Sequence, residues 1–208
     1  MYKLATNIWT HDHMLCFEDG RKLPLRLTVV RLGNEKLWIH APTPLSNELK
    51  AAISELGEVG YLFCGNNLHN MFLMEWVYTY PLAEVWVTPE IPKKLRDLDK
   101  FRVLKKNIWI DEFDARSMKS VPKFDEVVFF HYESKSLIVT DLVQNNAKKG
   151  VFLAPPLLKK GVIQDQKAFR GFLNDIKAWD FRRIVITHGP IVDREAKRKF
   201  ERICECFF

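Results

Sequence analysis

The chain has 208 residues, of which 47% are hydrophobic and 28% charged, so it can bury a core and is not a disordered chain. Its net charge of +6 comes from small lysine and arginine clusters with acidic residues between them, a pattern that does not favour nucleic-acid binding. Four scattered cysteines exclude a disulfide framework, and no apolar run is long enough for a membrane-spanning helix. The N-terminus has no signal-peptide pattern, so we expect a cytoplasmic protein with no membrane or nucleic-acid partner.

The first third of the chain predicts strands around one helix. Residues 25–32 and 37–40 are apolar, β-branched runs of the kind found in strands. Ser46 suits the N-cap of a helix, because the apolar residues that follow it recur at helical spacing. These residues are Leu49, Ala52, Ile53 and Leu56. Residues 59–64 predict a further strand, which gives the strand–helix–strand unit of a layered sheet.

The rest of the chain alternates between helical and strand patterns. Helices are expected at residues 71–80, 89–99, 167–179 and from about residue 193. Strands are expected at residues 85–87, 126–131, 137–141 and 183–187. Residues 144–164 are the stretch that is expected to be irregular. This alternation predicts an α/β fold.

Four side chains that can bind a metal end or follow predicted strands: His69, His131, Asp141 and His188. Because binding crevices form at strand ends in open α/β sheets, these residues are candidates for one site. Imidazole and carboxylate groups together suit zinc, iron or manganese. Each residue taken alone is more simply interpreted as solvated or as bound to a loop, and Asp141 also suits a helix N-cap.

Five sequence stretches carry a family resemblance: residues 37–42, 65–69, 126–131, 136–142 and 186–189. Their order and spacing resemble the metallo-β-lactamase fold, and more closely a poorly characterised family of metallo-β-lactamase-like proteins with degenerate metal motifs. The resemblance spans roughly residues 25–190. It implies an αβ/βα sandwich, with two mixed sheets flanked by helices, in a single domain over residues 1–208.

The resemblance also implies a reduced set of metal ligands. Where the superfamily has H-x-H-x-D-H, residues 66–72 read NNLHNMF and keep only His69. Asp141 takes the place of the bridging carboxylate and His188 that of the final histidine. The middle histidine has no clear counterpart, which makes His131 a second-sphere or substitute ligand. His40 stands where a superfamily strand ends in aspartate.

Two functions follow from these residues. The first is a metallo-hydrolase-like protein with a reduced, mononuclear site, in which a metal-activated water attacks an ester, amide or phosphoester. The second is a non-catalytic protein of the same fold that binds a small molecule or a partner. The expected cofactor is accordingly one divalent ion (zinc, iron or manganese) or none, and the substrate is an unidentified small molecule.

Overall fold

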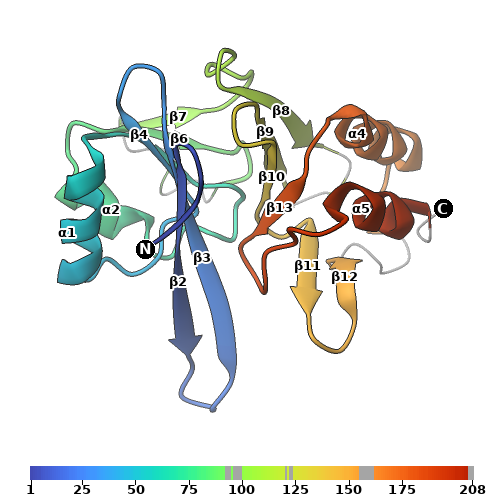
Figure 1. Ribbon diagram of the computed structural model, residues 1–208, viewed down its shortest axis with the longest axis horizontal. Coiled ribbons are helices and arrows are strands. Elements are labelled where there is room, and N and C mark those ends of the chain that lie inside the picture. Colours follow the sequence, from blue (N-terminus) through green and yellow to red (C-terminus); the bar gives the residue numbers. More distant parts are fainter. Residues whose placement is uncertain (92–94, 96–99, 120, 122–123, 155–161, 206–208) are drawn as a thin grey trace. The chain divides into compact units, whose positions relative to one another are not determined.

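The computed structural model describes residues 1–91, 95, 100–119, 121, 124–154 and 162–205. Its contacts divide the chain into two compact units, Met1–Lys106 and Asn107–Phe208 (Figure 1). The single domain expected over residues 1–208 stays a prediction. Among the described residues, no helix combines the length and the apolar character needed to cross a membrane.

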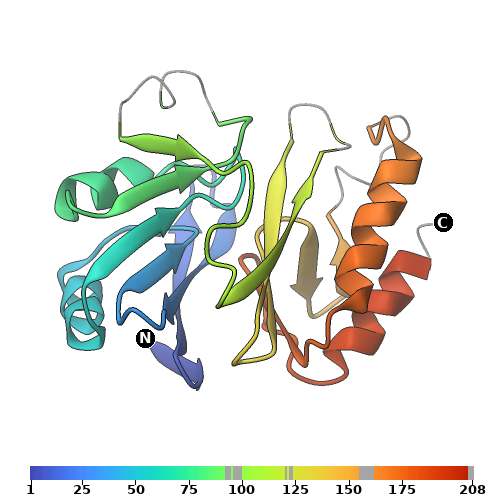
Figure 2. The same cartoon turned by 90° about the horizontal axis from the view of Figure 1, so that it is seen from above.

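The first unit is built on a seven-stranded mixed sheet. Its strands are hydrogen-bonded in chain order, antiparallel from β1 to β4 and parallel from β4 to β7. They are β1 (Tyr2–Ala5), β2 (Ile8–Cys16), β3 (Lys22–Arg31), β4 (Leu37–His40), β5 (Val59–Phe63), β6 (Glu84–Val87) and β7 (Phe101–Val103). Helices α1 (Asn47–Leu56) and α2 (Leu73–Thr79) lie on one face of this sheet (Figure 2).

The predicted cap of α1 is confirmed. Ser46 Oγ accepts a hydrogen bond from the backbone N–H of Leu49 at 3.2 Å, and the buried face of the helix presents Leu49 and Ile53. Ile53 joins Ile39, Leu62 and other residues in the hydrophobic core of this unit. Full burial of such side chains stabilises a fold by roughly 1.5–3 kcal/mol each, so the apolar spacing that predicts the helix also determines how it packs.

The second unit contains a four-stranded sheet in the order β13-β10-β9-β8 and a separate two-stranded hairpin. The sheet strands are β8 (Phe113–Met118), β9 (Glu126–His131), β10 (Ser136–Val139) and β13 (Arg183–Ile186). β10 pairs in parallel with β13 and antiparallel with β9. Helices α4 (Gln166–Ala178) and α5 (Ala196–Glu205) lie side by side in this unit (Figure 1). The predicted apolar face of α4 is confirmed, because Phe169, Phe172, Leu173 and Ile176 are all buried.

Several predicted boundaries are wrong, for local reasons. The stretch expected to be irregular contains the hairpin β11 (Val143–Asn146) and β12 (Gly150–Leu153), whose polar strands pair only with each other and lack a strong apolar pattern. β1 and β2 were not predicted, because the second half of β2 carries His11, Asp12 and His13 and so has no apolar run. The helix predicted at residues 89–99 lies largely outside the described residues.

The two mixed sheets with flanking helices agree with the predicted α/β class. The face-to-face packing of the sheets implied by the sandwich stays a prediction.

Candidate metal centre

Asp141 and His188 follow two neighbouring strands of the second unit at matching positions. β10 and β13 pair in parallel with Val139 opposite Ile186, and each candidate residue comes two positions after its strand. Thr187 Oγ1 donates a hydrogen bond to the carbonyl of Val139 at 3.3 Å, which extends the contact between the two chain segments beyond the ladder. Parallel pairing therefore brings both side chains to the same edge of the sheet.

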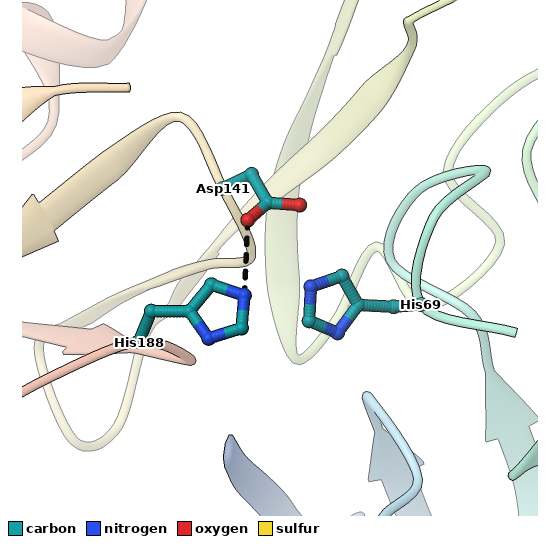
Figure 3. A group of neighbouring side chains, drawn as sticks. All are labelled: His69, Asp141 and His188. Atoms are coloured by element: carbon teal, nitrogen blue, oxygen red, sulfur yellow. Dashed lines mark ion pairs between the residues drawn. The ribbon is translucent and has the colours of Figure 1, made fainter. Parts of the chain in front are cut away.

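The two side chains contact each other. His188 Nε2 lies 3.1 Å from Asp141 Oδ1, the pair joined by a dashed line in Figure 3. The side chains are only 12% and 11% exposed, so solvent and salt screen their interaction little. An imidazole nitrogen and a carboxylate oxygen at this separation either share a proton in a hydrogen bond or bind one cation together.

Glu126 holds the loop that carries Asp141, and the sequence analysis did not identify it. This residue begins β9 and is fully buried. Its carboxylate oxygens accept hydrogen bonds from the backbone N–H groups of Thr140 at 2.7 Å, Asp141 at 2.9 Å and Leu142 at 2.8 Å. Three bonds from consecutive residues to one buried side chain hold the loop after β10 in one conformation.

The electrostatics of Glu126 reflect competing effects. Burial, followed by the charge of Asp141, raises the pKa of the Glu126 carboxyl to about 8, and the three backbone N–H groups limit this increase. Two carboxyl groups are thus concentrated at one buried place, which favours a cation there. An acidic residue opening an apolar strand was the available signal, because glutamate is almost never fully buried without partners.

His69 lies in the first unit, in the loop between β5 and α2, and its side chain is also drawn in Figure 3. Buried Asn66 shapes this loop, since its Oδ1 accepts hydrogen bonds from the backbone N–H groups of Leu68 at 2.9 Å and His69 at 3.0 Å. The buried Cys64 thiol donates to the carbonyl of His69 at 3.1 Å. The turn around Asn66 explains why α2 begins at Leu73 rather than at the predicted residue 71.

His40 lies close to His69 within the first unit. Burial, followed by the charge of His69, lowers the pKa of His40 to about 3. Its ring stacks on Trp38, with centroids 5.4 Å apart, and on Phe63 at 5.9 Å. His40 is therefore a neutral imidazole among aromatic rings and offers no carboxylate.

His131 is not brought to Asp141, contrary to the expectation that all four strand-end residues share one edge. β9 runs antiparallel to β10 with His131 opposite Ser136, so His131 lies beside the beginning of β10 and Asp141 follows its end. His131 is fully buried against the Phe113 ring, and its Nδ1 lies 2.7 Å from Ser134 Oγ. Burial lowers its pKa to about 4. The prediction overlooked strand direction, because a residue that ends an antiparallel strand lies at the opposite end of the sheet.

Comparison with known proteins supports the fold. The family model described as a domain of unknown function, DUF4336, matches residues 5–150. No curated protein matches the sequence.

Solved metallo-β-lactamases match nearly the whole chain. DIM-1 exposed to ceftazidime is 16% identical with a TM-score of 0.70, covering 98% of this chain and 95% of that one. The enzyme from Pontibacter korlensis is 15% identical with a TM-score of 0.67, covering 98% and 97%. FIM-1 from Pseudomonas aeruginosa, in its mono-zinc form, is 11% identical with a TM-score of 0.66, covering 99% and 94%. At these identities the likeness establishes the metallo-β-lactamase fold and confirms the predicted resemblance.

Proposed function

This chain belongs to the DUF4336 family, and from that premise we propose that it is a metallo-hydrolase-like protein in which Asp141 and His188 of the second unit bind one divalent metal ion, with His69 proposed as a further ligand from the sequence resemblance. The observation that carries the proposal is the buried contact between Asp141 and His188. The three residues offer two imidazole nitrogens and one carboxylate oxygen. Three such protein ligands with one position left for water or substrate are typical of catalytic zinc sites.

The distance between the paired donors fits a shared ion. Two donors bound at roughly 2.0–2.2 Å in tetrahedral geometry lie roughly 3.3–3.6 Å apart. His188 Nε2 and Asp141 Oδ1 are 3.1 Å apart, so a small adjustment would admit the ion. The charge of Asp141 contributes to the raised pKa of Glu126, so a cation bound at Asp141 would offset part of the repulsion between these two carboxyl groups.

A single ion is supported better than two. Asn66 stands at the beginning of the stretch that supplies most ligands in the superfamily, and here its side-chain oxygen is occupied by two backbone N–H groups. His40, where the superfamily has aspartate, is held among aromatic rings. FIM-1, a protein of this fold, has been solved with one zinc ion, so the fold accommodates a mononuclear site.

The chemistry proposed is hydrolysis of an ester, amide or phosphoester. A divalent ion would supply an acidified water molecule as the nucleophile. Asp141 and His188 would hold that ion at the edge of the β10–β13 pair, and the Glu126 bonds would prevent the Asp141 loop from moving. We propose His69 as the third ligand. The cytoplasmic location, the unidentified small-molecule substrate, and the lack of nucleic-acid and membrane partners stay predictions.

A second function, a non-catalytic binding module, is favoured by one observation. His188 Nε2 and Asp141 Oδ1, 3.1 Å apart, can form a hydrogen bond with each other, so neither side chain requires a metal as its partner. In that case the same edge would bind a small molecule or a partner through polar contacts. Metal binding and turnover separate the two functions.

The test is zinc binding by equilibrium dialysis, with the bound metal measured by atomic emission. We expect one zinc ion per wild-type chain and loss of binding in Asp141→Ala, His188→Ala and His69→Ala. His13→Ala is the matched control, because it removes a histidine from β2 of the first unit. Equal zinc content in all five proteins would overturn the proposal.

Turnover is then measured with a panel of nitrophenyl esters and phosphodiesters. Zinc-dependent hydrolysis that is absent from His188→Ala supports the hydrolase. No zinc bound by the wild-type protein, together with no turnover of any substrate, favours the binding module instead.

A further inference from the structure

We infer that Glu126 is a positioning residue for the proposed metal site, holding Asp141 in the orientation in which its carboxylate binds the ion. This inference rests on the proposed function. It assigns a role to a side chain that touches neither the ion nor the substrate. The evidence is the set of contacts that this one carboxylate makes with the loop after β10.

The first argument is the concentration of bonds. The backbone N–H groups of three consecutive residues, 140–142, all point at the Glu126 carboxylate, at 2.7, 2.9 and 2.8 Å. Asp141 is the middle residue of the three. Its Cα is therefore fixed by a bond to its own N–H and by bonds on both sides. Since Cα sets the origin of the side chain, the Glu126 bonds fix where the Asp141 side chain begins, and the contact with His188 orients its carboxylate.

The second argument is the place of these bonds in the sheet. β10 ends at Val139, so residues 140–142 lie beyond the strand that aligns Asp141 with His188. Glu126 belongs to β9, the strand on the other side of β10 from β13. The Asp141 loop is thus held from one side by Glu126 and approached from the other by His188. Because β9, β10 and β13 are hydrogen-bonded neighbours, Asp141 is held at a fixed position relative to His188.

The third argument is that only a carboxylate fits the role. Three N–H groups need an acceptor with several lone pairs, and the two oxygens of the Glu126 carboxyl group accept all three. Glutamine would keep one acceptor oxygen and turn an NH2 group toward backbone donors. Aspartate would keep the charge on a shorter side chain. Glu126→Gln therefore removes one acceptor oxygen, whereas Glu126→Asp keeps both oxygens and shortens the side chain.

A purely structural role would affect folding without affecting the metal. The test therefore measures two quantities on Glu126→Gln and Glu126→Asp. One is the zinc Kd of the folded protein, from competition with a chromophoric chelator. The other is the free energy of unfolding of the metal-free protein in EDTA. Asp165→Ala is the matched control, because Asp165 also accepts a backbone N–H, from Ala168 at 2.8 Å, but at the cap of α4.

The expected result is a zinc Kd about 10–100-fold weaker for Glu126→Gln, with the stoichiometry still one, as found when residues that support metal ligands are replaced. Glu126→Asp should lose less. Asp165→Ala should lower the stability and leave the Kd unchanged. Cobalt bound in place of zinc should also show a shifted visible spectrum in Glu126→Gln, which reports the changed ligand geometry directly.

Three outcomes separate the inference from the function on which it rests. If wild-type protein binds no zinc, both fail. If wild-type protein binds zinc and both Glu126 variants keep its Kd and the cobalt spectrum, the positioning role is overturned and the metal site stands. If Glu126→Gln does not fold, the Kd of Glu126→Asp decides, and a value equal to that of wild type overturns the inference.

Discussion

Replacing Gly189 by alanine should destabilise the second unit strongly. Gly189 follows His188 and has φ of +111°, a conformation that is essentially restricted to glycine. A Cβ at this position would lie 1.9 Å from the carbonyl oxygen of Asn145, in β11, whereas real Cβ atoms essentially never approach within 3.0 Å. The obstacle is backbone, so the loop or the hairpin would have to shift by about 1 Å against close-packed surroundings.

The expected cost combines two effects. The strained φ contributes about 1–3 kcal/mol, and the displaced backbone about as much again. We therefore expect the free energy of unfolding to fall by roughly 2–6 kcal/mol, which is a large effect for one methyl group. Urea unfolding followed by tryptophan fluorescence measures it, because Trp109 and Trp179 both belong to the second unit.

Two other glycines serve as matched controls. Gly20 has φ of +81° but nothing within 4 Å of its Cβ position, so Gly20→Ala should cost only about 1 kcal/mol. Gly171 lies within α4 with open space around it, so Gly171→Ala should stabilise by about 0.5–1 kcal/mol. If Gly189→Ala is as stable as Gly20→Ala, the contact between the added Cβ and the Asn145 carbonyl does not destabilise the protein, and the prediction is wrong.

Three further predictions concern stability. Ser46→Ala removes the acceptor at the cap of α1 and should lower the free energy of unfolding by about 1 kcal/mol, whereas no change in urea unfolding would mean that the cap is unimportant. Phe200→Ala empties a fully buried position in α5 and should cost about 3–5 kcal/mol in the same assay. The pKa of His131 is lowered from 6.5 to about 4 in the folded protein. As the pH falls, the unfolded chain therefore binds a proton at this residue before the folded protein does. The free energy of unfolding should fall between pH 6.5 and pH 4 by up to about 1.4 kcal/mol per pH unit. His131→Gln should reduce that slope, and an unchanged slope would show that the imidazole is already protonated in the folded protein.

The candidate site was predicted from the sequence in part. Asp141 and His188 were identified because each follows an apolar strand, and the structure brings these two together. His131 satisfied the same rule but lies at the opposite end of the sheet. Glu126 was missed because a buried acid at the beginning of a strand resembles a solvated loop residue until its partners, 14 to 16 positions away, are known.

Local patterns determined the elements of this protein. The cap at Ser46, the apolar face of α4 and the runs that became β9, β10 and β13 follow from spacing and side-chain type, which operate within a few residues. Tertiary structure alone decided strand direction and neighbourhood. Whether a strand-end residue reaches the site depends on which strand lies beside it and which way that strand runs, and those pairings join residues far apart in the chain. The parallel pairing of β10 with β13 brought Asp141 to His188, and the antiparallel pairing of β10 with β9 placed Glu126, rather than His131, beside them.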